Sequence, residues 1–115
     1  MAVAMFMRYP GVTPEQYDRL MQAFHLDADP PAGEMLHLAA EAGENGLRVA
    51  DIWRTKEAAE SFIEHRLRPA LVALGIPDDL EYEILPLHNA YAPDLDGLER
   101  IAALSLPGVS AGTPL

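Results

Sequence analysis

The chain has 115 residues, of which 50% are hydrophobic and 23% charged, a composition that predicts a single ordered globular domain. Its formal net charge of −10 argues against nucleic acid or an anionic membrane surface as a partner, and the absence of cysteine excludes disulfides, thiolate metal ligands and cysteine nucleophiles. No apolar run reaches the ~18 residues of a membrane span, and the first residues lack the basic leader of a signal peptide, so we expect a cytoplasmic protein.

The first two predicted elements are a strand and a helix. Residues 2–9 form an apolar run that ends in a Pro-Gly turn signal. The next segment starts with the capping residue Thr13 and has glutamine at the capping-box position. Apolar residues then recur at helical spacing and predict one buried helix face: Tyr17, Leu20, Met21 and Phe24. The Pro-Pro pair at 30–31 cannot continue this helix, which should end near His25.

A hairpin is predicted next. Two β-runs, residues 34–40 and 47–53, flank the segment 42–46, which contains Asn-Gly, a strong hairpin signal. Two registers are compatible with this pattern. If the Asn-Gly pair alone forms the turn, His37 and Asp51 face opposite sides of the sheet. If all five residues form the loop, His37 lies directly across from Asp51.

A second helix and a fourth strand complete the pattern. The helix begins after the cap at Thr55 and should be interrupted just before Pro69, which removes one backbone hydrogen bond. Residues 81–87 alternate between polar and apolar side chains and predict a strand. The remaining segment, 94–115, is punctuated by Gly, Pro and Ser and has room for a short helix at 97–104.

The predicted order, βαββαβ, is that of a ferredoxin-like α+β sandwich, which we assign to residues 1–93, with 94–115 as a C-terminal tail. Its two helices can cover only one face of the four-stranded antiparallel sheet. The first strand is nevertheless apolar on both faces, with Met5 on one side and Phe6 on the other. Since monomers seldom leave such a surface in water, we expect a homodimer in which two sheets pack together.

The junction between the third strand and the second helix carries the most specific motif. Residues 49–58 read Val-Ala-Asp-Ile-Trp-Arg-Thr-Lys-Glu-Ala, with the single tryptophan, Trp53, at the end of the strand. Together with residues 66–71 and 86–89, this junction resembles the antibiotic biosynthesis monooxygenase-like branch of the dimeric α+β barrel superfamily. The resemblance covers roughly residues 2–92.

The resemblance implies a small enzyme without a cofactor that acts on an apolar aromatic or polyketide-like substrate between the sheet and the helices. It implies that Trp53 lies against the substrate. The quinone-forming monooxygenases have an asparagine four residues before this tryptophan, where this chain has Val49, and the haem-degrading branch has an iron-binding histidine where this chain has Ile63. We therefore expect a monooxygenase, with a polyketide cyclase or isomerase, a non-catalytic ligand-binding protein and a haem-binding protein as alternatives.

Polar residues in apolar surroundings are the candidate catalytic groups. Arg66 falls within the apolar arc of the second helix and would either hold a substrate anion or form an ion pair with Asp51. Asp51 interrupts the apolar face of the third strand as a general base or as an ion-pair partner. His37, if oriented by Asp51, would move a proton. His88 ends the fourth strand as a proton shuttle or as a solvated side chain.

The other candidate residues would contact the substrate. Trp53 and Phe62 would supply aromatic surface, while Tyr9 and Asn89 would assist with polar groups. The histidines lie on separate elements without the local spacing of zinc sites, so no metal site is predicted, although one assembled only in the folded chain stays open. There is no P-loop or dinucleotide fingerprint, and no cofactor is expected.

Overall fold

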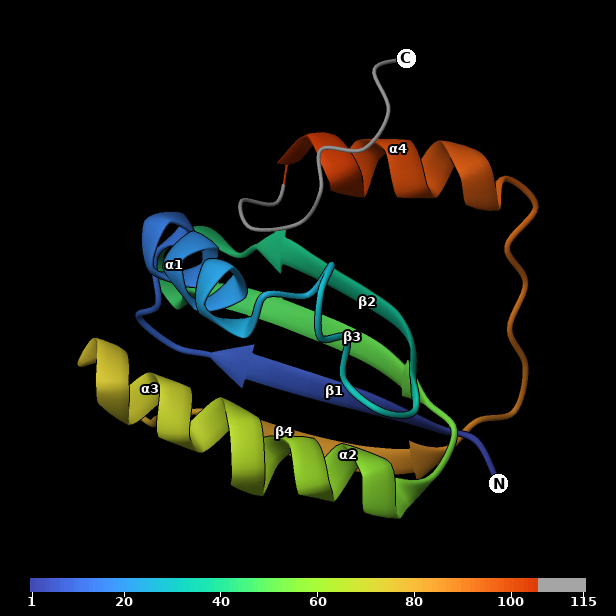
Figure 1. The fold of residues 1–115 in the computed structure, drawn as a ribbon, viewed down its shortest axis with the longest axis horizontal. Coiled ribbons are helices and arrows are strands. Elements are labelled where there is room, and N and C mark those ends of the chain that lie inside the picture. Colours follow the sequence, from blue (N-terminus) through green and yellow to red (C-terminus); the bar gives the residue numbers. More distant parts are fainter. Residues whose placement is uncertain (106–115) are drawn as a thin grey trace.

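Four antiparallel strands and the helices that connect them make up the fold in the computed structural model, which describes residues 1–105 (Figure 1). The strands are β1 (Val3–Tyr9), β2 (Glu34–Glu41), β3 (Leu47–Trp53) and β4 (Glu81–Pro86). The helices are α1 (Pro14–Phe24), α2 (Lys56–Phe62), α3 (Arg68–Leu74) and α4 (Leu95–Ser105), with the short helical turns η1 (Gly43–Asn45) and η2 (Ile63–Leu67). The sheet order β2-β3-β1-β4 confirms the predicted ferredoxin-like α+β fold.

Two threonine caps start the helices where the sequence predicts them. The Thr13 hydroxyl accepts a hydrogen bond from the Gln16 N–H at 3.1 Å, and the Gln16 side chain accepts one from the Thr13 N–H at 3.0 Å. The Thr55 hydroxyl accepts a bond from the Ala58 N–H at 3.0 Å. These caps satisfy N–H groups that have no partner within a helix, and so fix where α1 and α2 begin.

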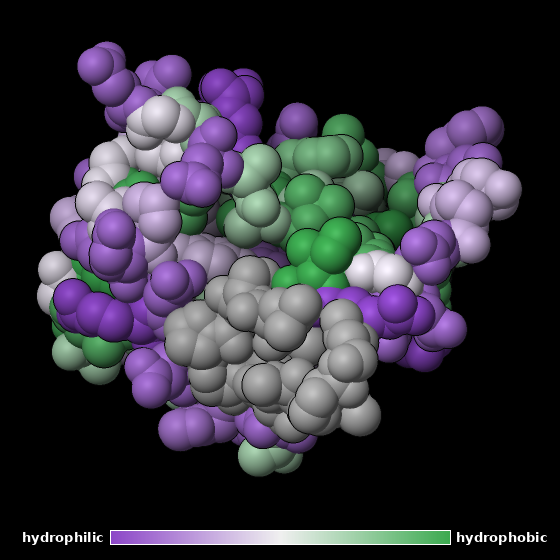
Figure 2. Space-filling model, turned by 90° about the horizontal axis from the view of Figure 1, so that it is seen from above, coloured by the Kyte–Doolittle hydropathy of each residue, from purple (hydrophilic) through white to green (hydrophobic). Residues whose placement is uncertain are grey.

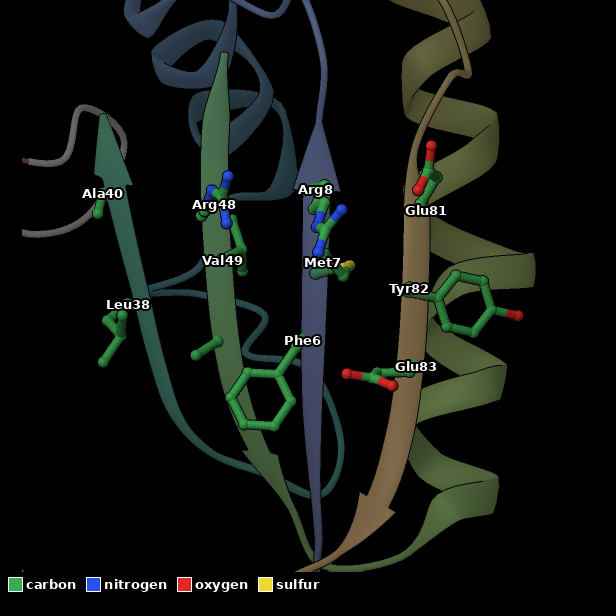
Figure 3. A pocket seen from close by; sticks show the side chains of 11 residues that line it. Phe6, Met7, Arg8, Leu38, Ala40, Arg48, Val49, Glu81, Tyr82 and Glu83 are labelled. Atoms are coloured by element: carbon green, nitrogen blue, oxygen red, sulfur yellow. The ribbon is translucent and has the colours of Figure 1, made fainter. Parts of the chain in front are cut away.

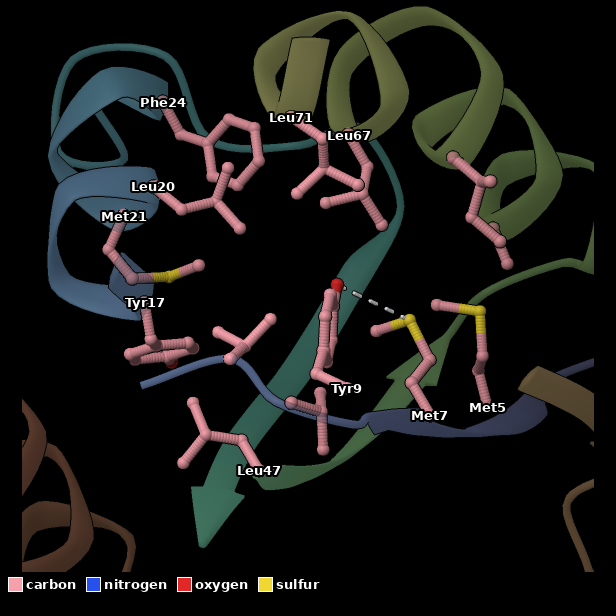
Figure 4. Packing of buried hydrophobic residues seen from close by; sticks show 14 of the residues in the cluster. Met5, Met7, Tyr9, Tyr17, Leu20, Met21, Phe24, Leu47, Leu67 and Leu71 are labelled. Carbon is pink, nitrogen blue, oxygen red and sulfur yellow. Dashed lines mark hydrogen bonds between the residues drawn. The ribbon is translucent and has the colours of Figure 1, made fainter. Parts of the chain in front are cut away.

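The core lies between one face of the sheet and the layer formed by α1, α2 and α3. Alternation along β1 turns Met5, Met7 and Tyr9 to this face, where each is at most 5% exposed. The helix residues that face them in Figure 4 are Leu20, Phe24, Leu67 and Leu71. Each fully buried leucine of this kind contributes about 1.5–3 kcal/mol relative to an exposed one, so this interface holds the helices on the sheet.

No helix among the described residues covers the central strands on the opposite face of the sheet. Phe6 is 47% exposed there and Leu38 45%. A broad hollow of about 510 Å³ opens on this face (Figure 3). Its rim carries charged residues of both signs, among them Arg8 and Glu81, which lie opposite each other on adjacent strands. We call this surface the open face. The expectation that the connecting helices cover one side only is confirmed.

The irregularity expected before Pro69 is the π-helical turn η2. The Arg68 N–H bonds to the carbonyl of Ile63, five residues earlier instead of four. A proline ring crowds the carbonyl four residues before it, here that of His65, and a wider turn relieves that contact. The turn keeps Ile63 and Leu67 in the core, both at most 1% exposed.

Helix α4 stands apart from the α1–α3 layer (Figure 1). It includes the short helix expected at 97–104 and starts two residues earlier. Its leucines Leu95 and Leu98 are 50% and 40% exposed. Figure 2, which views the molecule from the side of α4, shows hydrophobic residues gathered in one region with hydrophilic ones around it. The rest of the predicted tail, 106–115, lies outside the described residues. Within residues 1–105, no helix has the length and apolar character needed to cross a membrane.

Candidate functional site

The loop between β2 and β3 decides between the two predicted registers. It comprises all five residues 42–46 and is closed by a hydrogen bond from the Ala42 N–H to the Gly46 carbonyl at 2.8 Å. Gly46 has a φ of +79°, and a Cβ at this position would collide with the carbonyl oxygen of Tyr9, so only glycine fits. As a result His37 pairs directly with Asp51, as the second register predicts.

His37 and Asp51 form a close hydrogen-bonded pair between sheet and helices. The Nδ1–H of His37 donates to Asp51 Oδ1 at 2.6 Å, and the Asp51 side chain is 1% exposed. The indole Nε1–H of Trp53 donates to the other oxygen, Oδ2, at 3.4 Å. Both carboxylate oxygens of Asp51 therefore have donors, which satisfies a charge that would be costly to bury alone.

Tyr17 of α1 extends this pair into a line of three groups. Its hydroxyl lies 2.5 Å from His37 Nε2, and the two rings are almost parallel, with an interplanar angle of 6°. Burial, followed by the charges of Asp51 and Glu34, raises the pKa of the Tyr17 hydroxyl, so this hydroxyl stays protonated and donates to Nε2 whenever His37 is neutral. Burial lowers the pKa of His37, but the hydrogen bond and the charge of Asp51 outweigh it and leave the pKa above its ordinary value.

Glu34 joins the cluster because of a β-bulge. Residues 34 and 37 would face opposite sides of a regular strand, but the register shifts between Glu34 and Leu36, which places Glu34 opposite Trp53. Glu34, His37 and Asp51 each have one oxygen or nitrogen within 4.8 Å of the others. Burial and then the nearby Asp51 raise the pKa of Glu34 to about 7. We call Tyr17, Glu34, His37 and Asp51 the relay cluster.

A small cavity adjoins the relay cluster. Its volume is about 20 Å³, enough for about one water molecule. The lining residues are Met7, Tyr9, Tyr17, Met21, Phe24, Leu26, Glu34, His37, Val49, Asp51, Phe62 and Leu67. This cavity lies between sheet and helices, where the resemblance implies the substrate pocket, but its volume is too small for an aromatic substrate. Apolar side chains of α1 and α2 fill the remaining space.

The aromatic candidates lie at different depths around this cavity. Trp53 is 0% exposed and packs against Phe62 with ring centroids 5.3 Å apart, so it lies behind the cavity wall. Phe62 lines the cavity, as does Tyr9. The Tyr9 hydroxyl donates to Met7 Sδ at 3.8 Å (Figure 4), and burial raises its pKa. Contact of Trp53 with a substrate stays a prediction that requires Phe62 to move.

Arg66 does not pair with Asp51, so the expected ion pair between them is wrong. Its Nη2 donates to the carbonyl of Phe24 at 2.9 Å and lies 3.5 Å from a carboxylate oxygen of Asp29. Its guanidinium also lies over the Phe24 ring, 5.7 Å from the centroid. Arg66 thus caps the C-terminal end of α1, where a positive charge is favourable. Burial and the charge of Asp51 raise the pKa of Glu34, and the charge of Arg66 opposes that rise only in part.

His88 and Asn89 lie outside the relay cluster. Both are exposed and follow β4, at the sheet edge opposite to β2, and neither lines the cavity. Sequence reasoning missed two members of the relay cluster instead. Tyr17 was predicted only as a core residue, although a buried tyrosine usually needs a partner for its hydroxyl. Glu34 was missed because the bulge that turns it inward leaves no signal in the sequence.

Comparison with known proteins identifies the fold. No family model and no curated protein matches the chain. A protein of unknown function from Nitrosomonas europaea is 18% identical over 80% of this chain and 94% of its own, with a TM-score of 0.60. SnoaB, a cofactor-independent oxygenase from Streptomyces nogalater, is 13% identical over 77% of this chain and 94% of its own, with a TM-score of 0.54. A dimeric ferredoxin-like protein of unknown function from Thermobifida fusca is 17% identical over 76% of this chain and 92% of its own, with a TM-score of 0.52. The chain therefore has the ferredoxin-like α+β fold seen in the cofactor-independent oxygenase SnoaB and in proteins whose function is unknown.

Proposed function

We propose that this protein is a small cofactor-independent enzyme that deprotonates a phenol or enol of an aromatic, polyketide-like substrate, as an antibiotic-biosynthesis-type monooxygenase does. The observation that carries the proposal is the continuous line Tyr17–His37–Asp51 beside the cavity. A carboxylate that orients an imidazole, which in turn activates a hydroxyl, is a recurrent arrangement for moving a proton. The fold of SnoaB, itself a cofactor-independent oxygenase, makes the same chemistry available in this architecture.

The proton would travel through Tyr17 to His37. The Tyr17 hydroxyl gives its proton to His37 Nε2 while its oxygen takes the proton of the substrate hydroxyl, whose bonding electrons stay on the substrate oxygen. The transfer is concerted because burial raises the pKa of Tyr17 and disfavours a free tyrosinate. Asp51 holds the Nδ1–H tautomer and stabilises the imidazolium that forms.

The product of this step is an electron-rich phenolate or enolate. In the monooxygenase reaction it combines with molecular oxygen, one oxygen atom enters the product as a quinone carbonyl, and the other leaves as water. Oxygen is the only co-reactant that this sequence requires. Arg66 would favour the developing anion through its charge, which reaches Glu34 at the cavity.

Substrate access requires the cavity to enlarge. Small-molecule pockets measure about 300–1,000 Å³, against about 20 Å³ here. Phe62 and Leu26 line the cavity and are only partly buried, so they are the side chains whose displacement would open it. Movement of Phe62 would also bring the substrate to Trp53, against which Phe62 now packs.

Two other functions each have an observation in their favour. A cyclase or isomerase would use the same relay cluster without oxygen, and Val49, which lines the cavity where quinone-forming monooxygenases have asparagine, favours it. A non-catalytic ligand-binding protein is favoured by the filled cavity. Turnover that persists under strictly anaerobic conditions would replace the oxygenase by the cyclase or isomerase.

A direct test compares turnover of hydroxyanthrone-type phenols and enolisable polyketide analogues by the wild-type protein, His37→Gln and His88→Gln. We expect oxygen-dependent turnover that falls by about 100-fold or more in His37→Gln, the usual range for a general base. His88→Gln is the matched control, because His88 is exposed and remote from the relay cluster. Equal turnover in both variants would refute the proposed role of His37.

We further propose that the protein acts as a homodimer, with the two open faces packed together, in the cytoplasm. The half-exposed Phe6 and Leu38 support this arrangement, because a monomer would leave them in water. Arg8 and Arg48 of one copy have Glu81 and Glu83 available as partners on the other (Figure 3). A dimeric ferredoxin-like protein with the same fold is known from Thermobifida fusca.

A further inference from the structure

Three side chains of the relay cluster have the chemistry of a metal site. Glu34, His37 and Asp51 offer two carboxylate oxygens and one imidazole nitrogen, and one ligand atom of each lies within 4.8 Å of the others. A mixed nitrogen and oxygen set of this kind suits divalent first-row cations such as Zn²⁺ and Mn²⁺. We propose that these three residues bind one divalent first-row transition-metal ion.

The hydrogen bonds around the relay cluster orient the two atoms that would bind the metal, one on His37 and one on Asp51, toward each other. Tyr17 holds His37 through Nε2, and Trp53 holds Asp51 through Oδ2. Nδ1 and Oδ1 are thereby turned toward each other at 2.6 Å. Partners on the far side of metal ligands commonly fix ligand orientation in this way. With a metal on Nδ1, the Nε2–H of His37 would donate to the Tyr17 oxygen, which can accept it.

Only small movements would form the site. Zinc bonds of about 2.0–2.2 Å place neighbouring ligand atoms roughly 3.0–3.5 Å apart, so Nδ1 and Oδ1, now 2.6 Å apart, must separate by about 0.4–0.9 Å. Glu34 must approach from at most 4.8 Å, which its flexible side chain at the start of β2 allows. The cavity beside the cluster has room for the water molecule that would complete the coordination.

The local charge favours a cation. Two carboxylates face one imidazole, and in residues 1–105 no lysine or arginine forms an ion pair with Glu34 or Asp51. Arg66 is engaged by Asp29 and the Phe24 carbonyl and acts on Glu34 only through its field. A divalent ion would offset the repulsion between the two carboxylates and would place a Lewis acid at the cavity wall.

The test titrates the purified protein with Zn²⁺ by calorimetry and with Co²⁺ by visible absorption at pH 7.5. We expect the wild-type protein to bind one ion per chain. The affinity should fall at least 10-fold in both His37→Gln and Glu34→Gln and stay unchanged in His65→Gln, because His65 is an exposed residue of η2. We also expect the affinity to fall as the pH drops from 7.5 to 6, because a proton competes for His37. Circular dichroism establishes that each variant is folded.

Equal affinity of all three variants would overturn the proposal, as would a failure of the wild-type protein to bind either ion below millimolar concentration. The metal proposal and the proposed function fail separately. If the protein binds Zn²⁺ but shows no turnover, only the proposed enzymatic function is refuted. If turnover depends on His37 but the protein binds no metal, only the proposed metal site is refuted. If both hold, Zn²⁺ should inhibit the acid–base reaction because it displaces the Nδ1 proton.

Discussion

Replacing Asp51 by asparagine keeps the shape of the buried pair and removes its charge. The Asp51 side chain is 1% exposed, so water does not replace the lost interaction. Hydrogen bonds to charged groups contribute about 1.5–3 kcal/mol, and since asparagine retains one acceptor we expect a loss of about 2 kcal/mol in unfolding free energy. Asparagine has only one acceptor oxygen for the two donors, His37 Nδ1–H and Trp53 Nε1–H, that now bond to the two oxygens of Asp51.

The pH dependence gives this prediction a distinctive sign. Asp51 raises the pKa of folded His37 above its ordinary 6.5, so the folded protein retains a proton that the unfolded chain loses. This contribution is fully present below pH 6.5 and is lost as the pH rises through the folded pKa. Asp51→Asn removes the charge of Asp51 and its charge-assisted hydrogen bond, so burial is opposed only by the charge of Glu34 and the pKa of His37 falls. The loss of stability between pH 6 and pH 9 should therefore shrink.

Urea unfolding of the wild-type protein, Asp51→Asn and Asp79→Asn over pH 6–9 measures both effects. Asp79 is exposed and gives the same change in net charge. For a chain of 115 residues, 2 kcal/mol corresponds to about 8 °C in melting temperature, well above the error of a thermal scan. If Asp51→Asn unfolds with the same free energy and the same pH slope as Asp79→Asn, the buried charged pair does not exist in solution.

Three further predictions follow from the same structure. Tyr17→Phe leaves His37 Nε2 without its hydrogen-bond partner. The unfolding free energy should fall by about 1 kcal/mol in urea unfolding, and turnover should fall in a kinetic assay. Glu34→Gln removes a carboxyl with a pKa of about 7, so the loss of stability that the wild-type protein shows as the pH rises from 4.5 to 7 should diminish in a pH series of melting curves. Phe6→Asp should shift sedimentation to the monomer, whereas Val72→Asp, on the exposed side of α3, should leave the dimer intact. A dimer that survives Phe6→Asp at micromolar concentration would contradict packing through the open face.

The elements of this fold could be predicted from sequence because their signals are local. Caps at Thr13 and Thr55 mark the helix starts, and two-residue alternation in β1 marks the core face. Pro69, which falls inside the second predicted helix, also predicts an irregular helical turn before it. Each of these signals depends on residues only a few positions apart along the chain, so a single sequence is enough to detect it.

The relay cluster could be predicted only in part, because it depends on choices that local sequence leaves open. Asn-Gly at the end of the hairpin loop is compatible with a two-residue turn, yet the close approach of Gly46 to the Tyr9 carbonyl fits the five-residue loop. That register pairs His37 with Asp51. A helical wheel places Arg66 toward the sheet but cannot reveal that the end of α1 offers it a carbonyl nearer than Asp51.

The bulge in β2 has a consequence for how proteins of this shape can diverge. Side chains of a pleated strand alternate between its two faces, so Glu34 and His37 share the inner face only because Met35 is an extra residue in the strand. If the same residues paired regularly, without the bulge, Glu34 would turn to the outer surface of the sheet. Deletion of Met35 would instead remove the bulge and keep Glu34 on the inner face, because Glu34 would then lie two residues before His37. The number of carboxylates inside a sheet of this shape therefore depends on how the edge strand pairs, as well as on which residue stands at this position.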